Sequence, residues 1–204
     1  MHSHRPRVLI IGHSFVRRLQ EALHSPNNPD LAPDMKLSQC DVFLFGIGGL
    51  KISSAPAFLG RVKTVLEDKR PDICILQIGE NDLCSHTVRP LSLASTIDDV
   101  ACSLLSDFQV SVVYVSQLFT RPSPRSITLD EYLTRRDDTN HYLEVMLASH
   151  SRVFYWTHKR MFHSPLLIFA RDGVHLNPVG TRKFFKSLRQ AIIFAVEKFN
   201  AAVC

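Results

Sequence analysis

The chain has 204 residues, of which 45% are hydrophobic. This length suits one well-filled globular domain over residues 1–204 and is too short to expect two. Lys and Arg number 24 against 19 Asp and Glu, and the net charge of +5 is compatible with an anionic partner such as nucleic acid without identifying one. No apolar stretch approaches the ~20 residues that a membrane-spanning helix needs, so the sequence predicts no membrane span.

The cysteines and the first residues bear on where the protein works. The five cysteines, at positions 40, 74, 84, 102 and 204, are odd in number and form no Cys-x-x-Cys pair. Most lie in apolar segments, which favours reduced, buried thiols. The N-terminal residues lead directly into a short strand-like run that lacks the length of a secretory signal. We expect a soluble intracellular protein, in the cytoplasm or the nucleus.

Short apolar runs alternate with segments of helical period along the chain. Strands, rich in β-branched or aromatic residues and expected to be buried on both faces, are predicted at residues 8–11, 42–45, 73–78, 110–115 and 153–156. Amphipathic helices are predicted around residues 15–23, 58–66, 97–105, 129–149 and 178–199. Asn177 is the expected N-cap of the last helix, with Pro178 at its first position.

This alternation of strands and helices predicts the fold class. Parallel neighbouring strands need crossover connections, and helices then cover both faces of the sheet. We therefore predict a flavodoxin-like three-layer α/β/α sandwich with a five-stranded parallel sheet in the order 2-1-3-4-5. The longest irregular stretch, residues 117–128, is expected to form a surface loop near the site.

Polar and glycine residues gather after the predicted strands. Gly12-His13-Ser14 follows the first strand, residues 46–49 follow the second and residues 79–82 follow the third. Ligands of open α/β sheets bind beyond the carboxyl ends of the strands, so these loops are expected to meet at one edge. The segment from Asp172 to His175 follows the last strand and can fold back to the same edge.

These four blocks carry a resemblance to a known family. Gly-x-Ser14, Phe45-Gly46-Ile47-Gly48-Gly49, Gly79-Glu80-Asn81-Asp82 and Asp172-Gly173-Val174-His175 occur in the order found in the SGNH hydrolases, also called the GDSL esterase superfamily. Each block alone is a short motif that occurs commonly in turns and loops. Four in order, each after the expected strand, are a specific pattern that spans nearly the whole chain.

The resemblance implies a catalytic triad. Ser14 would be the nucleophile, exposed at a helix start where the helix dipole favours a developing anion. His175 would take its proton, and Asp172 would hold the imidazole in the required tautomer. The alternative interpretations are structural: Ser14 would be a helix N-cap, and His175 would be a surface or capping residue.

The resemblance also implies an oxyanion hole made by the backbone N–H of Ser14 together with Gly49 and Asn81. Glycine lets the backbone approach a substrate closely, and an Asn amide donates without carrying charge. A plain turn glycine and an Asx-turn are the structural alternatives. Gly49 is preferred to Gly48 because it ends the second block, where the family places its donor.

One residue departs from the family pattern. The acidic residue of the Gly-Asp-Ser signature is His13 here, which puts in question the hydrogen bonding that shapes the nucleophile turn. His13 as the true base is an alternative, although adjacent side chains on such a turn usually diverge. Glu80 is expected to line the pocket or to face water.

The opening Gly-His-Ser-Phe-Val-Arg-Arg and the closing Asp-Gly-Val-His-Leu-Asn-Pro also resemble the SGNH esterase domains of some animal retroelements.

Other side chains are candidates for substrate binding. Apolar residues that flank the motif loops are either an acyl pocket or ordinary core: Leu50, Leu83, Phe119 and Phe169. Basic pairs on predicted helices are either solvated faces or a rim for an anionic substrate: Arg17, Arg18, Arg135 and Arg136. No metal constellation, phosphate loop or dinucleotide fingerprint is present, so we expect a mechanism without metal or cofactor.

The sequence thus predicts a serine esterase that hydrolyses a short acyl or acetyl ester of a small molecule through an acyl-serine intermediate. The alternative is a weakly active or inactive binding module that keeps the fold and takes an anionic, nucleic-acid partner. Basic charge and His13 favour the alternative, whereas an intact Ser14, Asn81, Asp172 and His175 favour the enzyme.

Overall fold

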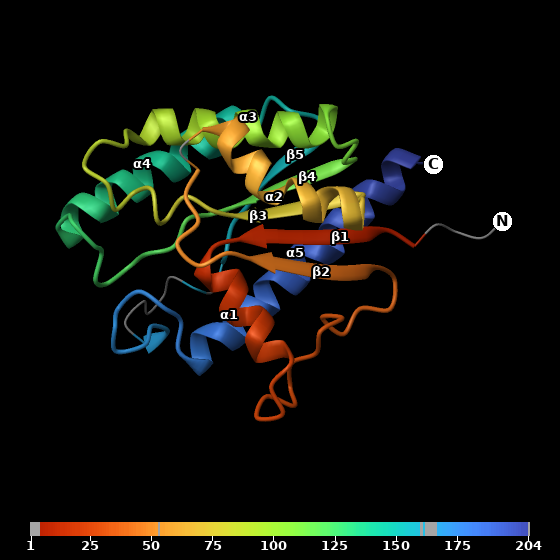
Figure 1. Ribbon diagram of the computed structural model, residues 1–204, viewed down its shortest axis with the longest axis horizontal. Coiled ribbons are helices and arrows are strands. Elements are labelled where there is room, and N and C mark those ends of the chain that lie inside the picture. The colour runs from red at the N-terminus through yellow and green to blue at the C-terminus, as the bar shows by residue number, and fades with distance from the viewer. Residues whose placement is uncertain (1–4, 53, 160, 162–166, 204) are drawn as a thin grey trace.

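The computed structural model describes residues 5–52, 54–159, 161 and 167–203, and it contains one five-stranded sheet (Figure 1). The strands are β1 (Arg7–Gly12), β2 (Asp41–Gly46), β3 (Ile73–Gln77), β4 (Val112–Ser116) and β5 (Val153–Trp156). All neighbouring pairs are parallel, in the order β2-β1-β3-β4-β5. The predicted fold class and strand order are confirmed.

In the part of the chain that the structure describes, five helices cover the two faces of this sheet. They are α1 (Ser14–Leu23), α2 (Ala55–Lys69), α3 (Pro90–Ser106), α4 (Leu129–Leu147) and α5 (Pro178–Val203). In Figure 1, α2, α3 and α4 lie on one side of the strands, and α1 and α5 lie on the other. Two apolar cores follow from this layering, because successive residues of β1 alternate between them: Val8 and Ile10 face α1 and α5, whereas Leu9 and Ile11 face the other three helices.

The last helix begins as its sequence predicts. The side-chain Oδ1 of Asn177 accepts a hydrogen bond from the Gly180 N–H at 2.9 Å, and Pro178 occupies the first helical position. This cap fixes where α5 starts. It therefore also fixes the length of the connection that precedes α5, which holds the Asp172 to His175 block.

Two expectations about burial are wrong. The edge strands are not buried on both faces, since every residue of β2 and three of the four residues of β5 are half-buried. Each lacks a neighbouring strand on one side, and the helices cover it incompletely. Residues 117–128 do not form a surface loop throughout, because residues 118–121 are buried beneath the helices. Among the described residues, no helix is both long and apolar enough to cross a membrane.

The turn after β4 is held by a buried tyrosine from α4. The Tyr132 hydroxyl is fully buried and donates a hydrogen bond to the Phe119 carbonyl at 2.8 Å. Burial raises the pKa of Tyr132 well above its ordinary value, so this hydroxyl keeps its proton and remains a donor.

We expect Tyr132→Phe to lower the free energy of unfolding by about 1–3 kcal/mol, because it leaves a buried carbonyl without its donor. Urea denaturation followed by circular dichroism measures the change. The half-buried Tyr142 on the same helix provides the matched control, and Tyr142→Phe should change the free energy of unfolding by less than about 0.5 kcal/mol. Equal losses in the two variants would contradict the role of this hydrogen bond.

Candidate active site

The first turn of α1 places Ser14 at the carboxyl end of β1, the neighbour of the central strand β3. Ser14 is 6% exposed rather than exposed as expected. The connection before α5 covers this turn, and the Phe169 ring lies 6.5 Å from the Phe15 ring, centroid to centroid. Figure 1 shows the same arrangement, with the loop that leads into α5 beside the start of α1. Chain segments far apart in the sequence therefore meet at this sheet edge.

The predicted acid–base pair is formed. Asp172 Oδ2 lies 2.6 Å from His175 Nδ1, and Asp172 Oδ1 accepts the backbone N–H groups of Val174 and His175, each at 2.9 Å. Burial acts to raise the pKa of Asp172, but these hydrogen bonds outweigh it and hold the pKa well below its usual range. The carboxylate therefore stays ionised and fixes the imidazole with its proton on Nδ1, which leaves Nε2 as an acceptor.

The Asp172–His175 turn is anchored to the loop after β4. The Ser123 N–H donates to the Gly173 carbonyl at 3.0 Å, and Phe169 pairs with Leu176 in an antiparallel bridge. Gly173 has a φ of +61°, and a Cβ there would lie 2.3 Å from Ser123 Oγ. Only glycine fits both the left-handed backbone and this close approach.

Ser14 and His175 are not joined by a hydrogen bond. In the described part of the chain, the Ser14 hydroxyl has His13 Nδ1 as its side-chain partner, at 3.5 Å, and no bond to His175 is formed. The pKa of His13 is lowered by burial, which outweighs the opposing effect of Glu80. The predicted nucleophile and base thus share one edge of the sheet without a closed triad.

The two predicted oxyanion residues lie on neighbouring loops that contact each other. The Asn81 Nδ2 donates to the Leu50 carbonyl at 2.8 Å, which ties the loop after β3 to the loop after β2. One of its two amide hydrogens remains for another acceptor. Gly49 has a φ of +70°, and a Cβ there would meet open space. Glycine therefore serves the backbone conformation at this position and not a close packing contact.

Asp82 was not singled out from the sequence, although it ends the third block. Its Oδ1 accepts the Ile52 N–H at 2.9 Å, its side chain is buried, and its Oδ2 has no hydrogen-bond partner among the described residues. Burial raises its pKa to about 6. Asp82 thus fixes the loop that carries Gly49 while bearing a poorly compensated charge.

His13 and Glu80 form a buried pair. Both side chains are fully buried, and His13 Nε2 lies 2.6 Å from Glu80 Oε2. Glu80 therefore does not face water, because its buried carboxylate is directed to the histidine at the start of α1, and a role in lining the substrate pocket stays a prediction. Sequence reasoning noted both residues, but their 67-residue separation gave no signal of the contact.

The apolar candidates are part of the two cores. Leu50 and Leu83 are buried on the side of α2, α3 and α4, whereas Phe119 and Phe169 are buried on the side of α1 and α5. These are the ordinary core positions that the sequence left open. A role for any of them in holding an acyl group stays a prediction.

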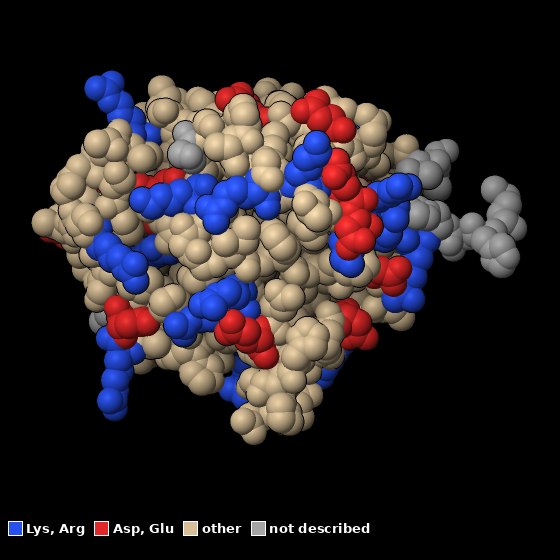
Figure 2. Space-filling view, viewed as in Figure 1, with Lys and Arg blue, Asp and Glu red and all other residues tan. Residues whose placement is uncertain are grey.

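Three of the four singled-out arginines have local structural partners. Arg17 pairs with Glu21 one helical turn away, Arg135 donates to backbone carbonyls before α3 and pairs with Glu131, and Arg136 donates to the Thr120 hydroxyl. On the face that Figure 2 shows, basic side chains are interspersed with acidic ones. This distribution gives no single-sign rim for an anionic polymer on that face.

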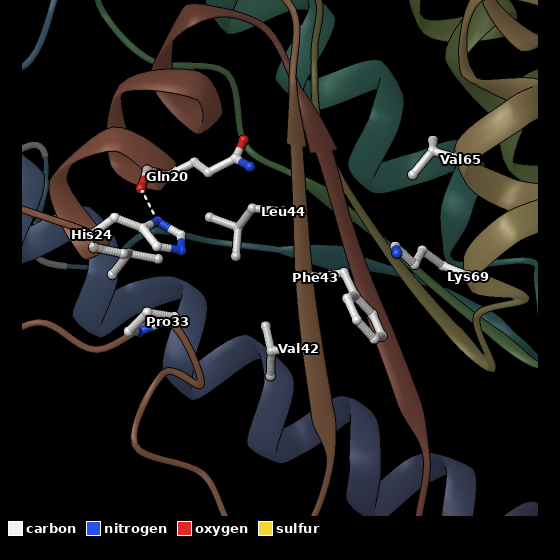
Figure 3. Close-up of a pocket in the computed structure, with 9 residues that line it drawn as sticks. Gln20, His24, Pro33, Val42, Phe43, Leu44, Val65 and Lys69 are labelled. Carbon is white, nitrogen blue, oxygen red and sulfur yellow. Dashed lines mark hydrogen bonds between the residues drawn. The ribbon is translucent and has the colours of Figure 1, made fainter.

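Two other features lie away from Ser14. The ligand atoms of Asp98, Cys102 and His150 lie within 4.8 Å of one another, and His150 lies three residues before the start of the edge strand β5. Separate from both sites is a pocket beside β2 (Figure 3), lined by Gln20, Leu23, His24, Pro33, Val42, Phe43, Leu44, Val65 and Lys69. It adjoins the end of α1 that is remote from Ser14.

Comparison with known proteins identifies solved structures with the same fold. A GDSL-like lipase from Bacteroides thetaiotaomicron is 17% identical, with a TM-score of 0.68 over 94% of this chain and 89% of that chain. A carbohydrate esterase of family 3 from Talaromyces cellulolyticus is 14% identical, with a TM-score of 0.66 over 94% and 98%. A lipase/acylhydrolase from Enterococcus faecalis is 15% identical, with a TM-score of 0.65 over 92% and 95%.

No family model matches the chain, and no curated protein sequence matches it. At these identities the structural likeness establishes the fold of the GDSL-like lipases and acylhydrolases. It agrees with the family resemblance carried by the four sequence blocks.

The raised pKa of Asp82 predicts a pH-dependent stability. The unfolded carboxyl titrates near 3.9, and the folded one near 6, so between these values the folded protein binds more protons and stability falls as pH rises. Asp82→Asn removes this titration. Relative to wild type, we expect the variant to gain about 2 kcal/mol of unfolding free energy between pH 4 and pH 7. Denaturation at both pH values measures the change, and a pH-independent difference would contradict it.

Proposed function

We propose that this protein is a serine ester hydrolase in which Ser14, His175 and Asp172 form the triad. The observation that carries the proposal is the 2.6 Å Asp172–His175 hydrogen bond in a turn packed against the start of α1, where Ser14 lies. That bond leaves an unprotonated imidazole nitrogen available as a base. The fold, which is shared with GDSL-like lipases and esterases, supports the same reaction class.

The reaction follows from these positions. Ser14 Oγ attacks the ester carbonyl carbon while its proton passes to His175 Nε2, and the new imidazolium is stabilised by the Asp172 carboxylate. The resulting oxyanion accepts hydrogen bonds from the backbone N–H groups of Ser14 and Gly49 and from the second amide hydrogen of Asn81. The alcohol then leaves with the proton from His175.

The second half of the reaction uses the same groups. Water attacks the acyl-Ser14 carbonyl carbon as His175 takes its proton, and the proton returns to Ser14 Oγ when the acid is released. The chemistry needs no metal or cofactor. Only His13 separates β1 from α1, and this short nucleophile turn supports a small acyl group, such as acetyl, on a small-molecule ester.

We expect Ser14→Ala to abolish turnover of short-chain nitrophenyl esters and labelling by a fluorophosphonate probe, because it removes the only oxygen that the acyl group would occupy. A panel of esters with graded acyl length identifies the acyl group in the wild-type protein. Ser149→Ala, at an exposed position after α4, serves as the control and should retain activity. Full turnover by Ser14→Ala, or labelling at another residue, would disprove the assignment.

Asp172→Asn tests the second member of the triad. Its amide can donate to the imidazole and so favours the wrong tautomer, and it cannot stabilise an imidazolium. We expect kcat to fall on the order of 10²- to 10⁴-fold while KM changes little. Steady-state kinetics on the best ester of the panel gives both constants. An unchanged kcat would show that Asp172 does not act on His175 in the reaction.

A further inference from the structure

The proposed mechanism leaves one buried pair at the nucleophile unused. His13 and Glu80 are completely buried, and the His13 Nε2–H donates to Glu80 Oε2 at 2.6 Å. A buried ion or polar group persists only where its partners are close and complete. The surroundings of the two side chains therefore decide in which protonation state and orientation they are held.

The carboxylate of Glu80 is held on both oxygens. Its Oε1 accepts the Gln77 side-chain amide at 2.6 Å and the Phe119 N–H at 3.2 Å. Gln77 cannot reverse its amide, since its Oε1 is already bonded to His158 Nε2 at 2.9 Å. Glu80 thus has a single orientation, with Oε2 directed at His13.

The hydrogen bonds of the pair fix an ionised Glu80 and a neutral His13. Burial alone would raise the pKa of Glu80, but its hydrogen bond to His13 and the buried Arg121 guanidinium keep that pKa below its ordinary value. Burial lowers the pKa of His13 against the opposing effect of Glu80, and the Phe15 N–H, which can only donate, is directed at His13 Nδ1. The single imidazole proton therefore stays on Nε2, facing the carboxylate, and Nδ1 is an acceptor.

This acceptor faces the start of α1. His13 is the N-cap of the helix, and its Nδ1 receives the Phe15 N–H at 3.4 Å and the Ser14 hydroxyl at 3.5 Å. Both distances are long, so each bond is weak and easily exchanged. Among the described residues, the Ser14 hydroxyl thus has His13 Nδ1 as its side-chain acceptor, and a second possible acceptor, His175, lies on the turn that packs nearby.

We propose that His13, oriented by Glu80, is a positioning residue for Ser14: its Nδ1 holds the Ser14 hydroxyl in the resting enzyme and releases it to His175 when the acyl group binds. His13 takes no proton, because the proton of Ser14 passes to His175 Nε2 during attack. This inference rests on the proposed function. It also accounts for the departure from the family pattern, since an aspartate at position 13 would set two carboxylates against each other.

Two substitutions of His13 distinguish the contact of its Nδ1 with Ser14 from the contact of its Nε2 with Glu80. In the His13→Asn variant, the new amide oxygen lies near the position that Nδ1 of the histidine occupies. This variant therefore keeps an acceptor for the Ser14 hydroxyl and loses the hydrogen bond to Glu80. In the His13→Gln variant, the longer side-chain amide reaches Glu80, but no acceptor lies at the position that Nδ1 of the histidine occupies. We expect kcat and the rate of fluorophosphonate labelling to fall about tenfold in His13→Gln and less than about threefold in His13→Asn, with KM unchanged.

A merely structural role of His13 predicts the reverse order, because the buried Glu80 charge would then be the group that needs its partner. His13→Gln as active as wild type, or less affected than His13→Asn, would overturn the proposal. If His13→Asn fails to fold, the comparison is repeated with Glu80→Gln in both variants, which removes the buried charge. Absence of ester turnover and labelling in the wild-type protein would instead refute the proposed function itself.

Discussion

The register of β1 between its two neighbours is the constraint on which the candidate site depends. Gly12 lies opposite Gly46 of β2 and opposite Gln77 of β3, so the three strands end at one level. The segments that follow them consequently start side by side, and they carry Ser14, the second block and Asn81. Shifting β1 by one residue would exchange its two buried faces and move the nucleophile turn out of line.

The strand ends also determine how closely α1 can approach the sheet. A Cβ on Gly12 would lie 2.4 Å from Val16 Cγ2, and one on Gly46 would lie 2.1 Å from the Arg17 nitrogen. Because the helix packs so tightly, its first turn is buried, and every polar group there needs a partner within the protein. His13 and Glu80 meet this need at the nucleophile, which connects the packing of the helix to the orientation of the Ser14 hydroxyl.

The fold and the residue types of the site could be predicted because both depend on local sequence patterns. Strand-length apolar runs and the three-to-four spacing of the helices predict a parallel sheet and its order, and Asn177 predicts the start of α5. Burial was predicted less well, since it depends on neighbours. The edge position of β2 and β5, the covering of Ser14 and the burial of residues 118–121 follow from packing between segments distant in sequence.

The sequence by itself determined the element order, the strand ends at which the polar residues gather and the Asp172–His175 spacing, since each depends on residues close together along the chain. Only the tertiary structure decided the partners across the chain: Asn81 with the Leu50 carbonyl and Glu80 with His13. Such contacts join residues tens of positions apart, and no periodicity encodes them. The fold alone brings a carboxylate 67 residues away to the side chain beside the nucleophile.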